Sequence, residues 1–253
     1  MKLTEDEIIS NYDKLIKFIN ENFNNTDRAN QLKKIYTNDV FVDRLLYAPA
    51  SSKEYYHNCF PGGYIIHILN VIKFAQELDK LWVDIMENKR TYTYEELLFV
   101  ALNHDLGKLG DKNEELYITH DIRWKKERGE LYDFNSNINH MKVEDRTLFL
   151  LQQYDIKVTL NEYLAIKLHD GLYDDSNRDY LINWSDAKKL KTDLPIILHH
   201  ADMMSTMMEY RNWKNNEISQ QTKKKIKNKS VKQTNIKGVI KNTDLINSFF
   251  NKK

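Results

Sequence analysis

The spacing of the apolar residues, three and four positions apart along most of the chain, is the feature that most constrains the fold. In a helix this spacing gathers apolar side chains on one face, whereas a strand requires alternation. The N-terminal segment shows such a stripe at Ile8, Ile9, Tyr12, Leu15, Ile16 and Ile19. Only 7 glycines and 3 prolines occur in the 253 residues, too few for the turns of a many-stranded fold. The sequence therefore predicts an all-α protein.

Two Thr-x-x-Glu sequences predict where helices begin. Thr4 with Glu7 and Thr93 with Glu96 have the spacing of a capping box, in which each side chain bonds to the backbone N–H of the other residue. Other helices are expected from near Gly62 or Gly63 and over residues 140–154, 161–168 and 195–213. The last of these has a proline in its first turn, where a backbone N–H would have no helical partner.

Three parts of the chain are distinguished by pattern and charge. Residues 1–50 are predicted to form a helical extension that packs on the core, residues 51–213 the main domain, and residues 214–253 a basic tail. The tail holds eleven lysines against Glu217 and Asp244, a net charge of +9. Because the whole chain carries +1, the remaining residues carry −8. The tail is therefore expected to behave as a separate electrostatic segment.

The single cysteine and the lack of a long apolar run indicate the expected compartment. Cys59 has no second cysteine with which to form an intrachain disulfide, and no signal peptide or membrane-spanning segment is evident. We expect a cytoplasmic protein without a membrane partner. The abundance of Asn, Lys, Ile and Tyr suggests an AT-rich genome, such as that of a bacterium or of a phage within its host.

Six histidines and aspartates stand on predicted apolar-faced helices or at their ends, where a polar side chain needs a partner. They are His67, His104, Asp105, His140, His169 and Asp202. One helical histidine alone is more often a hydrogen-bonded core residue than a metal ligand. Imidazole nitrogens and carboxylate oxygens bind Mn, Fe, Co, Ni or Zn, and a carboxylate can also bridge two metals. The set as a whole favours a site for one or two divalent transition-metal ions.

The adjacent residues His104 and Asp105 place a condition on this site. Neighbouring positions of a helix differ by about 100° in direction, so both side chains reach one metal centre only where the helix ends or is distorted. The helix that follows Thr93 is expected to end near Gly107 and Gly110. The glycines would supply the required helix end.

Five stretches of the sequence resemble, in order, the motifs of the HD-domain metal-dependent phosphohydrolase superfamily. They are "GGYIIH", "HDLGK", His140 at the start of a helix, "AIKLHDG" and "LHHADMMST". The resemblance covers about residues 56–210 and implies an HD-domain helical bundle.

The resemblance also implies a set of metal ligands. One metal would be held by His67, His104, Asp105 and Asp202. Asp105 would bridge to a second metal held by His140 and His169. Where some members carry a second histidine after the position of His169, this chain has Asp170. That aspartate either leaves the second site incomplete or contacts metal-bound water.

The activity implied by the resemblance is hydrolysis of a phosphoester or phosphoanhydride by metal-activated water. Asp105 and Lys108 are the expected catalytic residues, with the lysine stabilising charge on the phosphoryl oxygens. An alternative interpretation makes Lys108 a surface residue near a helix C-terminus, a favourable position for a cation.

The polar segment of residues 111–139 has no helical period and contains a cationic cluster around an aromatic residue. The cluster comprises Arg123, Trp124, Lys125, Lys126 and Arg128. Such a group can hold phosphates and stack on a base. We expect it to form a lid that binds a small phosphorylated substrate, above all a nucleotide. A solvated charged loop is the alternative.

Four further histidines are weaker candidates. His199 shares a helix face with Asp202 and is expected to contact substrate, whereas His200 points elsewhere and is expected to be structural. His57 is expected to line the mouth of the pocket. His120 lies in the long polar segment, within reach of a substrate bound there.

Two other classes of function stay open. Some relatives in the superfamily use four histidines and two aspartates for a di-iron centre that activates oxygen. The basic tail is compatible with an RNA-directed hydrolase or a nucleic-acid-binding protein, because lysines give salt-dependent affinity for phosphate backbones. Apolar residues in the last twenty positions favour docking of that segment onto the domain or onto a second subunit of a homo-oligomer.

Overall fold

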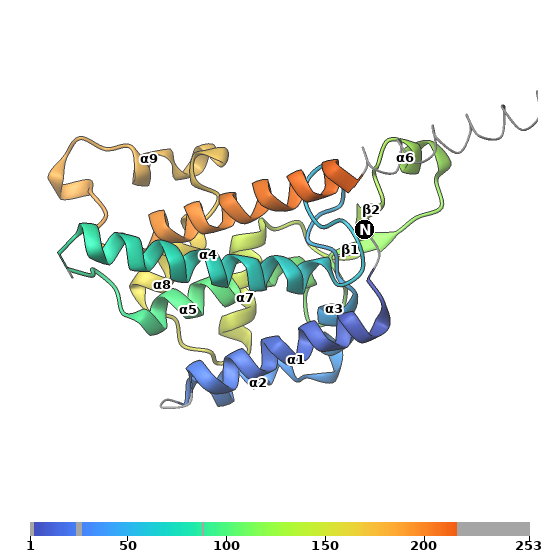
Figure 1. Ribbon diagram of the computed structural model, residues 1–253, viewed down its shortest axis with the longest axis horizontal. Helices are drawn as coiled ribbons and strands as arrows, with labels where there is room; N and C mark the ends of the chain where they lie inside the picture. Colours follow the sequence, from blue (N-terminus) through green and yellow to red (C-terminus); the bar gives the residue numbers. More distant parts are fainter. Residues whose placement is uncertain (1–2, 24–26, 88, 217–253) are drawn as a thin grey trace, which may run out of the picture. The chain divides into compact units, whose positions relative to one another are not determined.

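The computed structural model describes residues 3–23, 27–87 and 89–216, and most of them are helical (Figure 1). The α-helices are α1 (Glu5–Asn22), α2 (Arg28–Tyr36), α3 (Asp39–Tyr47), α4 (Gly63–Ile85), α5 (Tyr94–Asn103), α6 (Arg123–Glu127), α7 (Val143–Gln153), α8 (Leu160–Leu168), α9 (Arg178–Leu181) and a helix of residues 194–216. Short 3₁₀ helices are η1 (Leu106–Leu109), η2 (Gly171–Tyr173), η3 (Asp175–Asn177) and η4 (Asp186–Lys188).

Capping boxes define the starts of three helices. Thr4 caps α1 with Glu7 at the third position, and Thr93 caps α5 in the same way, so both sequence predictions are confirmed. The same Thr-x-x-Glu spacing at Thr159 caps α8. Each box satisfies backbone N–H groups that the first helical turn leaves without partners, typically worth about 1 kcal/mol.

One hydrophobic core joins the N-terminal helices to the helices that carry the candidate ligands. Its fully buried aromatic side chains come from α1 to α5 or directly after them, and are Phe23, Tyr36, Phe41, Tyr64 and Phe99. Full burial of such a side chain contributes about 2–3 kcal/mol. Helices α4 and α5 pack side by side in this core, and α5 also contacts α8 (Figure 1). The core therefore holds rigid the helices from which the site is built.

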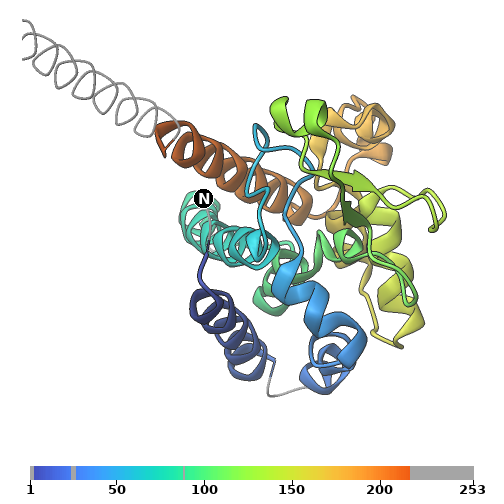
Figure 2. The same ribbon diagram turned by 90° about the vertical axis from the view of Figure 1, so that its right-hand side faces the viewer.

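A short antiparallel ribbon is, within the described part of the chain, the departure from a wholly helical fold. Strands β1 (Tyr117–Thr119) and β2 (Tyr132–Phe134) pair with Tyr117 opposite Phe134, and α6 lies between them. The ring centroids of Tyr117 and Phe134 are 5.5 Å apart. Cross-strand aromatic pairs of this kind stabilise a ribbon, which explains why the segment of residues 111–139 has no helical period. The ribbon faces the viewer in Figure 2.

Residues Met1–Tyr210 form one compact unit, and Arg211–Lys253 belong to a second. Of the second unit the structure describes residues 211–216, so nearly all of the predicted basic tail, with its proposed docking and nucleic-acid contacts, lies outside the described residues. Among the described helices, none combines the length and the apolar character needed to cross a bilayer.

The thiol of Cys59 is buried beside the ribbon and is expected to be unreactive. Burial raises the pKa of Cys59 to about 12, so the thiol stays protonated at pH 8. Because the thiolate is the reactive form, we expect alkylation by iodoacetamide at pH 8 to be at least about 100-fold slower in the folded protein than in denaturant. Mass spectrometry of timed reactions measures this ratio, and equal rates would show that the loop around Cys59 opens readily.

Candidate metal centre

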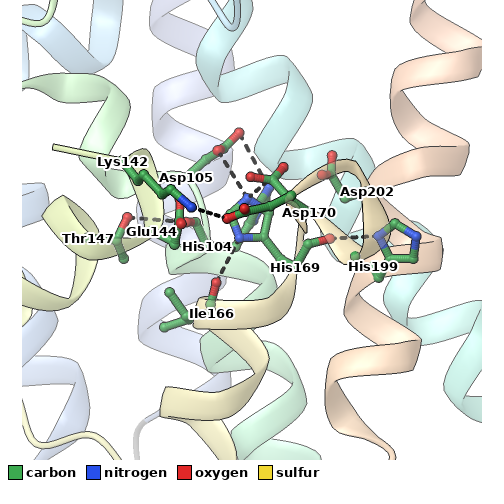
Figure 3. Close-up of polar contacts among 12 residues, drawn as sticks. His104, Asp105, Lys142, Glu144, Thr147, Ile166, His169, Asp170, His199 and Asp202 are labelled. Atoms are coloured by element: carbon green, nitrogen blue, oxygen red, sulfur yellow. Dashed lines mark hydrogen bonds and ion pairs between the residues drawn. The ribbon is translucent and has the colours of Figure 1, made fainter. Parts of the chain in front are cut away.

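Five of the six predicted ligands converge on one buried point, although they come from four separate segments. Figure 3 labels four of them, His104, Asp105, His169 and Asp202. His67 lies in the second turn of α4, His104 and Asp105 follow α5, His169 follows α8, and Asp202 lies on the helix of residues 194–216. His67, His104, Asp105 and His169 are all at most 2% exposed.

The distances at this point are those of a ligand cage. His67 Nε2 lies 3.1 Å from Asp202 Oδ1 and 3.4 Å from Asp105 Oδ2. His104 Nε2 lies 3.4 Å from the same Asp105 Oδ2. Two ligand atoms that each stand about 2.1 Å from a common cation are separated by roughly 3.0 to 3.4 Å. The spacing therefore fits a transition-metal ion.

Three atoms of the cage lack hydrogen-bond partners within the part of the chain that the structure describes. They are His67 Nε2, His104 Nε2 and Asp105 Oδ2, each fully buried. The nearby carboxylates stand at ion-pair distance without hydrogen-bond alignment. Asp105 Oδ2 has an ion-pair partner in Lys108, whereas the two imidazole nitrogens have no donor or acceptor aligned with them among the described residues. A buried polar atom without a hydrogen bond costs about 1–3 kcal/mol, and a cation between the three atoms would bind all of them at once.

Each histidine of the cage is oriented by a hydrogen bond from its other ring nitrogen. His104 Nδ1 donates to Ala101 O at 3.1 Å, and His169 Nδ1 donates to Ile166 O at 2.8 Å. These bonds fix the tautomer that presents a lone pair at Nε2, the form that a metal requires.

Glu209 performs the corresponding role for His67 and was missed by the sequence analysis. Its Oε2 lies 3.1 Å from His67 Nδ1, and its Oε1 accepts from Asn70 Nδ2 at 2.7 Å. Glu209 is 4% exposed and follows Asp202 by seven residues, two turns along one helix face. That spacing is the signal that could have identified it.

The turn after α5 explains how adjacent residues reach one site. The helix ends at Asn103 rather than near the glycines. His104 keeps helical dihedral angles, whereas Asp105 departs from them with φ −103° and ψ 11°. Because the helix is already broken at Asp105, its carboxylate turns toward the imidazole of His104.

Helix α7 holds this turn in place. Thr147 Oγ1 donates to His104 O at 3.1 Å and accepts from Gly107 N at 2.8 Å, so it replaces hydrogen bonds that the ended helix no longer makes. A Cβ on Gly107 would stand 2.2 Å from Val143 O. Glycine is therefore required here for the close approach of α7 rather than for ending the helix.

Lys108 lies inside the site and is not a surface residue. Its Nζ stands 2.6 Å from Asp105 Oδ2, and its side chain is 12% exposed. Burial alone would lower the pKa of Lys108, but Asp105 outweighs that effect and raises it. Burial would likewise raise the pKa of Asp105, yet Lys108 and His104 hold it well below its usual range. The two groups therefore form a buried ion pair.

Two histidines of the site, His67 and His169, have raised pKa values, so a cation that binds them must displace protons. Burial alone would lower the pKa of His67, but Glu209, Asp105 and Asp202 together raise it well above its ordinary value. In the same way the pKa of His169 is raised to about 10, chiefly by Asp105 and Asp170 against the effect of burial.

Cation binding is therefore expected to strengthen as pH rises. Stability that the protonated histidines give to the metal-free fold is complete below pH 6.5 and is lost as pH rises toward 10. Binding releases these protons, so affinity increases over the same interval. Thermal unfolding with and without Mn²⁺ at pH 6.5, 7.5 and 8.5 should show a growing difference in Tm. A difference that shrinks with pH would contradict this protonation state.

Three groups of side chains among the described residues could hold a metal ion, with ligand atoms within 4.8 Å of one another. The first contains His67, His104 and Asp202. The second contains His169, Asp170 and Asp202, and the third contains His57, His67 and Glu209. Buried groups that could hold a metal are therefore present, and Asp170, which the sequence analysis left in doubt, belongs to one of them.

His140 is not brought into the cluster. Helix α7 begins at Val143, so the prediction of a helix from residue 140 is wrong by three residues and His140 lies exposed in the preceding loop. Lys142 in that loop forms an ion pair with Asp174. The position that the resemblance assigns to His140 near the second metal is therefore not reproduced.

The cationic cluster of α6 is present, but in the described part of the chain none of its residues lines a cavity together with Asp105, Lys108 or Asp202. The Arg123 side chain is 92% exposed and pairs with Glu127, and Lys125 Nζ stands 2.7 Å from Asp133. Arg128 and Lys125 lie 5.8 and 5.9 Å from the ring centroid of Trp124, which is 54% exposed. The ion pairs between the cationic cluster and neighbouring acidic residues correspond to the alternative of a solvated charged loop. The role of the cluster in binding substrate stays a prediction.

The other histidines are distributed as follows. His199 Nδ1 donates to His169 O at 2.7 Å, so it touches the backbone of a ligand (Figure 3). His57 reaches deeper than a pocket mouth, with its ring centroid 4.7 Å from that of His67. His200 is exposed and donates from Nδ1 to Ile196 O, and His120 accepts from Ile122 N.

A cavity of about 520 Å³, termed here the ligand cavity, opens on the cluster. Its lining includes Asp105, Lys108, His169, Asp170 and Asp202 from the metal centre, together with apolar side chains such as Met203 and Met207. This volume lies within the range of pockets that bind small molecules.

Comparisons of the chain with family models, with curated proteins and with solved structures found no match. The interpretation of the site therefore depends on its own geometry and on the motifs of the sequence.

Proposed function

We propose that the protein is a metal-dependent phosphohydrolase of the HD-domain class that acts on a small phosphorylated substrate, above all a nucleotide. The observation that carries the proposal is the convergence of three buried atoms, His67 Nε2, His104 Nε2 and Asp105 Oδ2, beside a cavity, with no hydrogen bond to the two imidazole nitrogens among the described residues. Mixed imidazole and carboxylate ligands suit Mn, Fe, Co, Ni or Zn. One or two such ions are the proposed cofactors.

The chain's own residues would divide the catalytic work as follows. When bound, a divalent cation makes water nucleophilic near neutral pH and neutralises phosphoryl charge. Asp105 directs Oδ2 toward His67 and His104, while its Oδ1 lies 3.7 Å from His169 Nε2. The two oxygens of the Asp105 carboxylate therefore face different histidines of the site. Lys108, already desolvated, provides a cation for the phosphoryl oxygens in a low-dielectric cavity.

His57, which lines the ligand cavity beside His67, also supports the proposal. Burial, aided by Lys108 and His67, lowers the pKa of His57 well below its ordinary value, so the ring is neutral at pH 7. Its buried Nε2 has no hydrogen-bond partner among the described residues. A neutral imidazole there could bond to a substrate oxygen without adding repulsion to the metal centre.

The second cation position is proposed to use Asp170 in place of His140. His169 Nε2 lies 3.7 Å from both Asp105 Oδ1 and Asp170 Oδ1, beyond hydrogen-bond range and slightly wider than the spacing of ligands on one cation, so binding would draw the side chains a little closer together. We expect Asp170→Ala to weaken binding of a second equivalent of Mn²⁺ at least tenfold, as measured by titration calorimetry. His140→Ala is the matched control and should bind as wild type does. Loss of the second equivalent in His140→Ala alone would restore the assignment implied by the resemblance.

The test of the proposed function is a substrate panel. Metal-stripped protein is incubated with Mn, Co, Ni, Fe or Zn and with nucleoside mono-, di- and triphosphates, cyclic nucleotides and short RNAs. We expect metal-dependent release of phosphate or nucleotide from at least one of the small substrates. Oxygen consumption with iron and no phosphate release would favour the di-iron oxygenase, and cleavage of RNA alone would favour the RNA-directed hydrolase.

A further inference from the structure

A second cavity, termed here the side cavity, adjoins the ligand cavity and has a different chemical character. Its volume is about 530 Å³, and the two cavities share Tyr173, His199 and Met203 as common walls. The lining of the ligand cavity contains the charged side chains of the metal centre, whereas the described residues that line the side cavity include no Asp, Glu, Lys or Arg. A ligand that spans both would need an anionic end and an apolar end.

The apolar surface of the side cavity is open to water. Leu172 is 51% exposed, and Ile182 and Ile196 are exposed to a similar degree. Tyr173, at the boundary between the two cavities, is 85% exposed. Contiguous exposed apolar side chains next to a polar site are typical of a ligand-binding groove. A bound ring would remove this surface from water.

His199 is held rigidly at the boundary. Its Nδ1 donates to His169 O at 2.7 Å, and a Cβ on Gly171 would stand only 2.4 Å from its Cε1. Gly171, at φ +56°, is therefore required for the imidazole to lie in this position. Because Nδ1 donates, Nε2 of the neutral ring is an acceptor. The boundary thus offers one fixed acceptor for an N–H or O–H group of a ligand.

We propose that the side cavity binds the base of a nucleotide whose phosphate lies at the metal centre. This inference rests on the proposed function and deepens it by assigning the substrate's ring to residues from η2, α9 and the helix of residues 194–216. The rings of Tyr173 and His199 have centroids 6.4 Å apart. Two aromatic rings at the entrance favour a planar heterocycle over a flexible alkyl chain, because stacking is specific to flat partners. Trp124, the residue that the sequence suggested for stacking, lines neither cavity.

The experiment compares ligands with and without the base. Titration calorimetry of the full chain with Mn²⁺ measures the affinity for the non-hydrolysable 5′-methylenephosphonate analogue of AMP and for the matching analogue of ribose 5-phosphate. The same pair is measured for the guanine, cytosine and uracil compounds. We expect at least one base to improve affinity about tenfold or more over the base-free ligand.

Three variants locate the base. Ile196→Asp places a charge in the side cavity at a partly exposed position, and Tyr173→Ala removes an exposed ring, so neither should disturb folding. Both are expected to bring the ratio of base-containing to base-free affinity close to one. In Ile196→Asp, whose substituted residue lines the side cavity alone, the base-free ligand should bind as it does to wild type. Trp124→Ala is the control, and its ratio of base-containing to base-free affinity should equal that of wild type.

The possible failures are distinguishable. If the base-free analogue binds but no base improves affinity, the inference about the side cavity is wrong and the proposed function stands. If the ratio falls in Trp124→Ala and not in Ile196→Asp, the base binds to α6 instead. If neither kind of analogue binds, the proposed phosphate position at the metal centre is wrong, and the inference is lost with it.

Discussion

A His104→Leu variant is expected to lose the bound cation and, with it, more than about 99.9% of the hydrolytic rate. His104 Nε2 is one of the three buried atoms that a cation would satisfy, and leucine of similar volume offers no ligand in its place. Removing a residue that merely orients a ligand already costs 10–100-fold in affinity, so loss of the ligand itself should cost more than about 100-fold. A cation supplies several kcal/mol to the transition state, which corresponds to roughly 10³-fold in rate.

The matched control for this variant is His200→Leu. His200 Nδ1 donates to Ile196 O much as His104 Nδ1 donates to Ala101 O, but His200 is exposed and outside the cluster. Metal content by mass spectrometry after equilibration with Mn²⁺ should fall in the first variant and stay at the wild-type level in the second. Full metal content in His104→Leu would show that the cation binds elsewhere.

A Glu162→Ala variant is expected to unfold about 3 kcal/mol more easily than wild type. Glu162 Oε1 stands 2.6 Å from Arg28 Nη1, with side chains 1% and 13% exposed, so the pair connects α8 to α2 within the core. Removing one partner of a buried ion pair typically costs about 3–5 kcal/mol, and the variant also removes the hydrogen bond by which Glu162 Oε2 accepts from Thr159 N in the α8 capping box. Glu95, 3.7 Å from Arg28, offsets part of the loss. For a protein of this size the expected fall in Tm is about 10 °C.

Glu21→Ala provides the comparison for an exposed pair. Glu21 stands 3.7 Å from Lys17 with both side chains more than half exposed. Such pairs contribute about 0–1 kcal/mol, so the Tm of this variant should lie within about 3 °C of wild type. Urea titration followed by circular dichroism gives both free energies of unfolding. Equal stability of the two variants would mean that the N-terminal helices do not stabilise the site-bearing core.

The local features of the fold were accessible from the sequence because they depend on neighbouring residues. Helical spacing and two capping boxes predicted the character of the chain and the starts of α1 and α5. Boundaries that depend on distant contacts were less accessible. The end of α5 at Asn103 depends on Thr147, 44 residues further along the chain, and no local signal marks it. The β1–β2 ribbon likewise depends on cross-strand pairs.

The residues of the site also divide into those that the sequence could identify and those that depend on contacts between distant segments. His67, His104, Asp105, His169 and Asp202 were identified from their type and position on apolar helices, and the structure brings them together. His140 was selected in the same way and assigned to the second metal by the resemblance, but it lies in an exposed loop outside the cluster. Glu209 and His57 could not be assigned to the site from the sequence. They contact His67 only because α4 packs against the loop that holds His57 and against the helix of residues 194–216.

Sequence alone determined the helical character of this protein and the residue types from which a metal centre can be built, because hydrogen bonds and apolar stripes act over a few residues. Tertiary structure decided which of those residues meet, which atoms are left without partners, and where a substrate can enter. These outcomes depend on packing between segments far apart in the chain, where a shift of one ångström separates a cation ligand from an ordinary buried polar group.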